Sequence, residues 1–465
     1  MTDISDRLAA ILPAAAIKTA GPNYLEEPRG RWQGHAAAVV APGTAAEVAA
    51  VLRLAFDTGV PVIPFGGGTG LVGGQLVADG PAPIILSLER MRQIREFDVV
   101  AGTMVVEAGA ILADIHAAAE AEDWIFPLTL ASQGSARLGG LLATNAGGVN
   151  VIRYGNARDL CLGVEAVLAD GTLINTLSPL RKNNTGYDLR HLLIGSEGTL
   201  GVITAASLRV FPKPAATGSA LMVVPDPDAA LALLRLAQTQ IGGAVSAFEL
   251  IGKQGLDFLA EVGPETRQPF EPRPDWMCLI DLGMGADGDP SAALETLFAT
   301  AFEDAIVTDG VIATSEAQRA EFWALRENIP AANRLIGAVS SHDISVPVAK
   351  IPLFIAEAPG RIARIGEFRL NCFGHMGDGN LHYNVFPAPG RSRADHENQR
   401  SEIKRAIHDL VDELGGSVSA EHGVGRLKVD DLERYGDPGK LVAMRAIKTA
   451  LDPRGILNPG AVLRA

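Results

Sequence analysis

Two histidines stand close together in a glycine-rich segment of the second half of the chain. Residues 373–384 read FGHMGDGNLHYN, and Gly377-Asp378-Gly379 separates His375 from His382. Because this glycine pair forbids a continuous helix, we expect the histidines to flank a turn, with His382 and Asn384 on one face of the following strand. The residues that alternate with them would then face the core: Leu381, Tyr383 and Val385.

A second segment, 419–425, reads SAEHGVG and adds a carboxylate and an imidazole, Glu421 and His422. Two imidazoles and one carboxylate suit Zn²⁺ or Mn²⁺ with one position open for substrate oxygens. A 2-hydroxy acid could bind there through its hydroxyl and carboxylate, so that the metal lowers the pKa of the hydroxyl and a nearby base removes its proton. One histidine alone would indicate only a hydrogen-bonded core residue, whereas the two segments together favour a functional site.

A glycine loop near the N-terminus follows the strand expected at residues 61–65. The loop, 65–74, reads FGGGTGLVGG, and its backbone N–H groups could bind a diphosphate because glycine lets a phosphate approach the main chain. Its glycines also satisfy the GxGxxG pattern of dinucleotide-binding folds, but the residues that follow, 74–81, are a poor helix. No Lys-Ser/Thr pair closes this loop, as one does in a P-loop.

Two more clusters of small residues lie downstream. Residues 134–148 contain LGG and ATNAGG and precede Arg153-Tyr154-Gly155, and residues 194–203 read IGSEGTLGVI. Turns alone do not need so many glycines, and small residues would let the backbone contact a flat ring system.

Taken in order, PFGGGTGLVGG, ATNAGG with RYG, and GSEGTLGVIT resemble the FAD domain of the vanillyl-alcohol-oxidase (PCMH) type, and the C-terminal half is similar to the cap of FAD-linked oxidases. Some relatives attach the flavin through a histidine of the first loop; residues 61–80 contain none, so we expect non-covalent FAD. The resemblance implies FAD contacts at Gly66, Gly67, Gly68, Thr69, Gly70, Leu71, Ser132, Gly134, Gly140, Thr144, Asn145, Gly148, Arg153, Glu197, Gly198, Ile203 and Asn458.

GHMGDGNLHYN and SAEHGVG resemble the branch that contains D-2-hydroxyglutarate and D-lactate dehydrogenases, and SAEHG is nearer to the hydroxyglutarate members. The resemblance implies that His375, His382 and Glu421 bind a divalent metal, with zinc favoured. It also implies His422 as the base and Asn384 as a substrate contact. The expected enzyme is an FAD-dependent D-2-hydroxy acid dehydrogenase that passes hydride to flavin N5.

The segment FWALRE, 322–327, resembles the part of that branch whose arginine binds the substrate carboxylate, which implies this role for Arg326. Alone, the segment would indicate only a solvated charge on an amphipathic helix. Where hydroxyglutarate enzymes tend to carry a threonine and a lysine, this chain has Pro330 and Ser341, and His342 could compensate in part. A substrate like D-2-hydroxyglutarate is favoured, with D-lactate, D-malate or another 2-hydroxy acid as alternatives.

The expected elements indicate an α+β fold. Thr44 and Glu47 form a capping-box pattern before a helix that stops at Gly59, and Asp170-Gly171 predicts a hairpin turn. Longer helices follow a boundary near residues 212–214, at about 228–240, 290–303, 316–338, 395–414 and 437–451. We therefore expect a PCMH-type FAD domain at 1–215, a mixed substrate- and metal-binding cap at 216–420, and a C-terminal segment, 421–465, that returns to the FAD domain.

The composition of the chain limits its possible binding partners and its location. The net charge of −14 disfavours nucleic acid, and three scattered cysteines suggest neither a disulfide framework nor a thiolate cluster. The first residues do not resemble a secretory signal and no apolar run reaches membrane-spanning length, so we expect a soluble cytoplasmic protein. The acceptor that reoxidises the flavin, whether electron-transfer flavoprotein, quinone or oxygen, stays open, as does a homodimer.

The sequence disfavours three other functions. A flavin oxidase of another alcohol, such as an aldonolactone, is disfavoured by HxGDGNxH together with EHG. An NAD-binding Rossmann protein is disfavoured by the missing helix after Gly73. A non-enzymatic metal-binding or flavin-storage protein is disfavoured by the pairing of a base with metal ligands.

Overall fold

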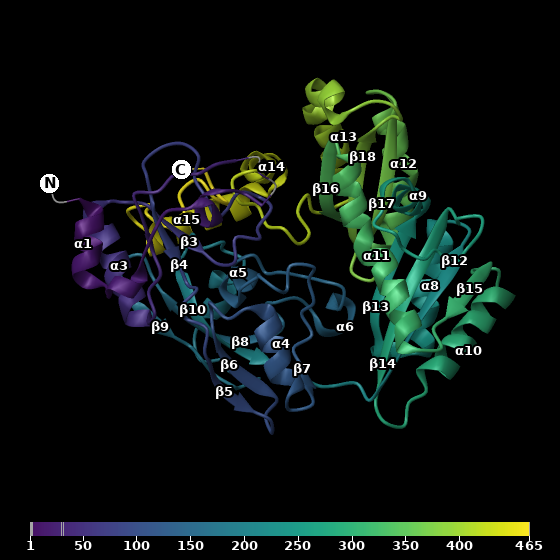
Figure 1. Cartoon of the computed structure of the whole chain (residues 1–465), viewed down its shortest axis with the longest axis horizontal. Helices are drawn as coiled ribbons and strands as arrows, with labels where there is room; N and C mark the ends of the chain where they lie inside the picture. Colours follow the sequence, from purple (N-terminus) through teal and green to yellow (C-terminus); the bar gives the residue numbers. More distant parts are fainter. Residues whose placement is uncertain (1–2, 29, 31, 465) are drawn as a thin grey trace. The chain divides into compact units, whose positions relative to one another are not determined.

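The computed structural model describes residues 3–28, 30 and 32–464, and their contacts form two compact units. The first unit comprises residues 1–147, 155–213 and 421–465, and the second comprises residues 148–154 and 214–420. Figure 1 shows the elements of each unit with their labels. The two units are described separately below.

The first unit contains a small sheet that carries the first glycine loop. Its strand order is β1-β2-β4-β3, and β2, β4 and β3 are parallel. The bounds are Ile17–Lys18 for β1, Ala38–Val40 for β2, Ile84–Ser87 for β4 and Val62–Phe65 for β3. The strand expected at 61–65 is therefore confirmed, and the glycine loop begins where β3 ends.

Helix α3 (Ala45–Thr58) connects β2 to β3. The hydroxyl of Thr44 accepts the N–H of Glu47 at 3.1 Å, as an N-cap does, and Gly59 ends the helix with φ of 71°. Both ends of this helix were correctly predicted from the sequence.

A five-stranded antiparallel sheet forms the rest of the core of this unit, in the order β5-β6-β10-β8-β9. The predicted hairpin is confirmed, since β8 pairs with β9 across the Asp170-Gly171 turn. The bounds are Ile94–Asp98, Thr103–Glu107, Val202–Arg209, Cys161–Val167 and Leu173–Asn175, and a short pair joins β7 (Trp124–Ile125) to β11 (Phe211–Pro212).

The C-terminal segment packs into this first unit. Its backbone continues the small sheet, because the Val62 N–H donates to the Ile456 carbonyl and the Asn458 N–H donates to the Val62 carbonyl, both at 2.8 Å. Helices of the unit, besides α3, are α1 (Ile4–Ile11), α2 (Pro22–Leu25), α4 (Leu112–Glu120), α5 (Leu138–Ala143), α7 (Leu189–Leu193), α14 (Val429–Tyr435) and α15 (Pro438–Leu451).

The second unit is built on a seven-stranded antiparallel sheet, in the order β15-β12-β14-β13-β17-β18-β16. The bounds, in that order, are Asp309–Ile312, Ala216–Val224, Trp276–Met284, Val245–Gly252, Phe368–His375, Asn380–Pro387 and Ser340–Ser345.

Helices cover both faces of this sheet. The larger core lies against α8 (Pro227–Gln240), α10 (Pro290–Glu303), α12 (Ile351–Ala363) and α13 (Arg400–Glu413). The smaller core lies against α9 (Lys253–Val262) and α11 (Glu316–Ile336). The predicted helices are confirmed, with ends that differ by a few residues. The prediction of an α+β architecture is also correct.

The sheet's alternation assigns the motif residues to the α11 face. Leu381, Tyr383 and Val385 of β18 belong to the larger core, as predicted, so His382 and Asn384 point to the opposite face. The smaller core agrees with this assignment, because Phe386 lies on the same face of β18 as His382 and Asn384 and packs with residues of α11.

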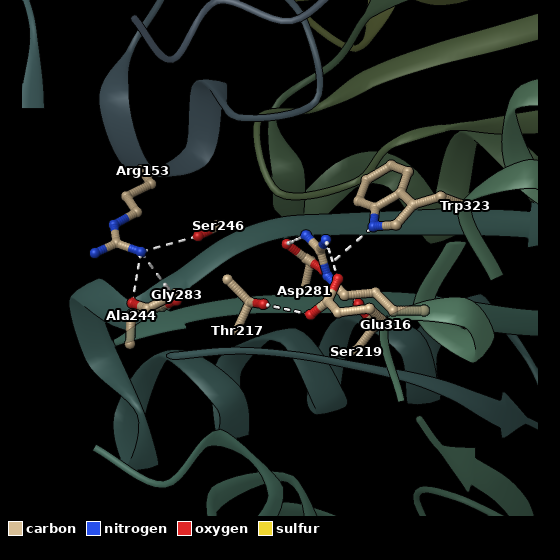
Figure 2. Close-up of polar contacts among 10 residues, drawn as sticks. Arg153, Thr217, Ser219, Ala244, Ser246, Asp281, Gly283, Glu316 and Trp323 are labelled. Carbon is tan, nitrogen blue, oxygen red and sulfur yellow. Dashed lines mark hydrogen bonds and ion pairs between the residues drawn. The ribbon is translucent and has the colours of Figure 1, made fainter. Parts of the chain in front are cut away.

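Helix α11 is bound to the sheet by polar contacts as well as apolar ones. The carboxylate of Asp281 on β14 accepts from both Nε and Nη2 of Arg319 at 3.0 Å and from the indole N–H of Trp323 at 3.2 Å. Ser219 of β12 also donates to it, and Thr217 donates to Glu316 at the start of the helix (Figure 2). These contacts fix the first half of the helix over β12 and β14.

The short segment 148–154 belongs to the second unit although glycine-rich sequence surrounds it. Its helix α6 (Val151–Tyr154) contains Arg153, whose Nη1 donates to Ser246 Oγ at 2.9 Å and to the Gly283 carbonyl at 2.7 Å (Figure 2). Arg153 therefore anchors this segment to β13 and β14.

Among the described helices, none combines the length and the apolar character that crossing a bilayer requires.

Candidate active site

A cavity opens in the first unit beside the first glycine loop. Eleven of the residues predicted to contact FAD line it: Gly66, Gly67, Gly68, Thr69, Gly70, Gly140, Thr144, Glu197, Gly198, Ile203 and Asn458. Leu71, Ser132, Gly134 and Asn145 of the first unit are not among its lining residues, and Gly148 and Arg153 belong to the second unit. For these six residues, the FAD contact stays a prediction without support from the cavity.

The first loop offers donors that suit a diphosphate. Within the described residues, the backbone N–H groups of residues 66–71 donate to no protein acceptor. Gly67 must lack a side chain, because a Cβ there would lie 2.1 Å from the Ser135 carbonyl oxygen. Gly68 has φ of 71°, in the region that favours glycine. The residues present therefore fit the diphosphate group that a flavin dinucleotide carries.

Glu197 holds the segment that follows His422. Its carboxylate is buried, and its two oxygens accept the N–H groups of Val424 at 2.7 Å and Gly425 at 2.8 Å. Burial raises the pKa of Glu197, although these two backbone donors act in the opposite direction. The sequence predicted an FAD contact here, whereas the structure shows a carboxylate already bound by the C-terminal segment.

Asn458 joins three segments at the cavity wall. Its Nδ2 donates to the carbonyls of Gly74 at 3.0 Å and Glu197 at 2.8 Å, while its Oδ1 accepts from Nη2 of Arg426 at 2.7 Å. Arg426 also donates to the Gly73 carbonyl. Burial lowers the pKa of Arg426 to about 10, so it remains a cation at neutral pH. The residues after His422 are thereby fixed to the first glycine loop.

In the second unit, His375 and His382 lie side by side at the turn between β17 and β18. Their ring centroids are 5.5 Å apart, and the rings are nearly perpendicular. His375 is buried, and its Nδ1 lies 2.6 Å from Oε1 of Glu249 on β13. Burial raises the pKa of Glu249, but the charges of His375 and Arg326 outweigh this effect and lower it to about 2. Glu249 is therefore ionised at neutral pH.

His382 also faces a buried carboxylate. Its Nδ1 lies 3.9 Å from Oδ1 of Asp343, which is its cross-strand partner on β16. The amide of Asn380 fixes this carboxylate by donating to the same oxygen at 2.9 Å. Carboxylates beside Nδ1 are typical of metal-binding histidines, since they orient the ring and leave Nε2 for the ion.

Glu421 and His422 directly follow Ala420, the last residue of the second unit, whose N–H donates to the Asp343 carbonyl at 3.4 Å. Within the second unit, ligand atoms of His375 and His382 lie within 4.8 Å of each other and could hold a divalent ion. Glu421 as the third ligand and His422 as the base stay predictions from the sequence.

Arg326 and Asn384 lie on the same face of the sheet with capacity to bind a ligand. Arg326 is buried rather than solvated; its Nε donates to Glu249 at 2.7 Å, and its guanidinium lies 4.8 Å from the ring centre of Phe373. Within the described residues, Nη1 and Nη2 of Arg326 and the amide of Asn384 bond to no protein group. These three groups suit a carboxylate.

Sequence reasoning missed Glu249 and Asp343. Each is the single carboxylate of its strand, 126 and 39 residues from the histidine it faces. The available signal was an acidic residue at a position expected to be buried, which is rare unless the charge is paired.

Comparison with known proteins adds the family. The model for the C-terminal domain of FAD linked oxidases matches residues 213–462, and an FAD binding domain matches residues 36–177. The fold and the cavity thus define a flavoprotein of two units. The chain belongs to the FAD-linked oxidase family, which confirms the resemblance drawn from its glycine-rich motifs.

Similar curated proteins carry one name. A D-2-hydroxyglutarate dehydrogenase from Xanthomonas citri pv. viticola is 36% identical over 97% of this chain and 95% of its own length. The mitochondrial D-2-hydroxyglutarate dehydrogenase of Bos taurus is 37% identical over 98% of this chain and 83% of its own.

Among solved structures, p-cresol methylhydroxylase with substrate bound matches with a TM-score of 0.77, covering 99% of this chain and 96% of that one. At 16% identity this match supports the fold alone. The predicted PCMH-type fold is confirmed.

We expect Gly67→Ala to impair FAD binding. The added Cβ would meet the Ser135 carbonyl at 2.1 Å, so the loop must move and its N–H groups lose their arrangement. The dissociation constant of FAD, measured by flavin fluorescence quenching on the apoprotein, should rise at least about tenfold, as for a loss of about 1.4 kcal/mol. Gly285→Ala is the control, since a Cβ there meets nothing within 4 Å. Equal affinity in both variants would contradict the assigned role of the loop.

Proposed function

We propose that this chain is an FAD-dependent dehydrogenase that oxidises a D-2-hydroxy acid to the 2-oxo acid. The observation that carries the proposal is the pair of adjacent histidines, His375 and His382, each facing a buried carboxylate. The FAD-binding domain and the name shared by relatives at 34–37% identity support the same reaction.

FAD, when bound, supplies a two-electron acceptor at flavin N5. We assign the diphosphate to the N–H groups of residues 66–71, because residues 66–70 line the cavity and these N–H groups donate to no protein acceptor among the described residues. The other lining residues named above would contact the rest of the cofactor. We infer that FAD is held non-covalently, as expected from the first loop.

A divalent metal, with zinc favoured, would be held by His375, His382 and Glu421 and would supply Lewis acidity that lowers the pKa of the substrate hydroxyl. The carboxylates of Glu249 and Asp343 support this assignment because they orient the two imidazoles.

His422 is assigned as the base. It would take the hydroxyl proton of the substrate, and bound FAD would supply the acceptor for the hydride that leaves Cα, so that the alcohol carbon becomes a ketone. Glu197 contributes by binding the backbone two and three residues after His422, which restricts the loop that carries the base.

Arg326 is assigned to the substrate carboxylate through its two free Nη groups, with Asn384 as a second contact. A guanidinium that is held at Nε and stacked on Phe373 is already oriented for a bidentate contact, so little rotamer entropy is lost when substrate binds.

D-2-hydroxyglutarate is the first substrate to test, because the similar proteins bear that name. Two positions favour keeping D-lactate and D-malate as alternatives. Ser341 is the cross-strand partner of Asn384, and Pro330 lies one turn after Arg326 on α11; neither provides a cation for a second carboxylate.

The acceptor that reoxidises the flavin is proposed to be an electron-transfer flavoprotein or a quinone. A cytoplasmic location and a homodimer also remain predictions, and several relatives are named mitochondrial.

His422→Ala should slow anaerobic bleaching of the flavin by D-2-hydroxyglutarate about 10²- to 10⁴-fold, the usual contribution of a general base, while FAD stays bound. Stopped-flow absorbance measures the rate for this acid, for D-lactate, D-malate and their L-enantiomers. His191→Ala, a change at a half-exposed histidine of α7, is the control and should bleach at the wild-type rate. A rate unchanged in His422→Ala would reject the base assignment.

The purified protein should contain about one equivalent of divalent metal, and His375→Ala should lose it, because an incomplete ligand set binds weakly. Elemental analysis after dialysis measures the content, with His191→Ala as the control. Equal metal content in His375→Ala and wild type would show that the ion is bound elsewhere.

A further inference from the structure

Glu249 is the most completely buried carboxylate of the second unit's α11 face. Its side chain is 0% exposed, and its partners among the described residues are two residues assigned to the site. Oε2 accepts from Nε of Arg326 at 2.7 Å, and Oε1 lies 2.6 Å from Nδ1 of His375. One side chain therefore contacts both the residue assigned to the substrate carboxylate and a residue assigned to the metal.

This arrangement engages one nitrogen of each partner, Nε of Arg326 and Nδ1 of His375. An ionised carboxylate accepts hydrogen bonds only, so the imidazole of His375 carries its proton on Nδ1 and keeps the lone pair on Nε2. In the same way Nε of Arg326 is occupied, and Nη1 and Nη2 are left to a ligand. Phe373 of β17 lies on the same face of the sheet, and its ring contacts the guanidinium of Arg326 and fixes the plane of that group.

We propose that Glu249 is a positioning residue that orients His375 as a metal ligand and Arg326 as the carboxylate-binding residue at the same time. This inference rests on the proposed function, because it takes the assigned roles of His375 and Arg326 as given. It predicts that loss of the Glu249 charge weakens metal binding and substrate binding together, although Glu249 would touch neither the metal nor the substrate.

A purely structural role is the alternative, and the chain offers a matched control for it. Asp281 on β14 is also a buried carboxylate that pairs with an arginine of α11, Arg319, on the same face of the sheet. Its partners among the described residues are Ser219, Arg319 and Trp323, and none of these is assigned to the metal, the base or the substrate. Asp281→Asn therefore weakens the anchoring of the helix without changing the surroundings of His375.

The experiment measures the affinity of the full-length, metal-depleted, FAD-loaded protein for Zn²⁺ by competition with a chromophoric chelator. Glu249→Gln keeps the shape and removes the charge, and we expect its dissociation constant for Zn²⁺ to rise about 10- to 100-fold, as for other partners of metal-binding histidines. Asp281→Asn should stay within about twofold of wild type. His375→Ala defines the signal without the site.

Two further readouts separate positioning from damage. Histidine ¹⁵N chemical shifts of the metal-free protein should show His375 protonated on Nδ1 in wild type and Asp281→Asn, and a changed tautomer population in Glu249→Gln. The KM for the 2-hydroxy acid should also rise in Glu249→Gln and not in Asp281→Asn. Thermal unfolding and FAD content check that each variant is folded.

The outcomes distinguish this inference from the proposed function. If wild type shows no Zn²⁺ site that His375→Ala removes, the ligand assignment itself is wrong. If wild type has that site and Glu249→Gln binds Zn²⁺ equally well, or Asp281→Asn loses as much affinity, only the positioning role is overturned. Should Glu249→Gln fail to fold, Glu249→Asp keeps the charge but shortens the reach to two partners, and wild-type affinity in that variant would overturn the proposal.

Discussion

A buried negative charge organises the α11 face of the second unit. A carboxylate removed from water costs several kcal/mol unless charged or hydrogen-bonding groups compensate it. Glu249 meets this requirement through Arg326 from the helix and His375 from the neighbouring strand. Because both partners are needed, Glu249 constrains helix α11 relative to the strand pair β13 and β17, and with them the turn that leads to His382. This constraint orients the residues that are assigned to the metal and to the substrate.

The first unit depends on a different device, which is backbone rather than side-chain chemistry. Its cavity is lined in part by Gly66, Gly67, Gly68 and Gly70, whose N–H groups donate to no protein acceptor among the described residues. The wall is closed by hydrogen bonds of Glu197, Asn458 and Arg426 to main-chain atoms. These bonds join the first loop to the segment after His422. A rigid wall of this kind keeps donors arranged for an anionic cofactor before it binds, which lowers the ordering cost of binding.

The sequence was sufficient for features encoded by neighbouring residues. Thr44 and Gly59 mark the two ends of α3, and the alternation after Gly379 assigns Leu381 and Tyr383 to the core. The glycine-rich motifs also identified the family correctly. Each of these signals depends on local spacing, which a single sequence displays directly.

Features that depend on long-range pairing were not predictable in this way. Glu249 lies 126 residues from His375, and strand order alone brings them together. Glu197 and Arg153 occur in motifs typical of flavin contacts. In the structure, Glu197 accepts hydrogen bonds from the C-terminal segment, and Arg153 donates to β13 and β14. A motif predicts which residues matter, whereas their partners are set by the sheet register.

In the proposed reaction, a D-2-hydroxy acid gives up its Cα hydrogen as hydride to the bound flavin. Single-turnover reduction of the FAD-loaded protein, with D-2-hydroxyglutarate carrying deuterium or protium at C2, measures this transfer. We predict stoichiometric formation of the 2-oxo acid and slower reduction with deuterium. A flavin that stays oxidised with this acid, with D-lactate and with D-malate would contradict it.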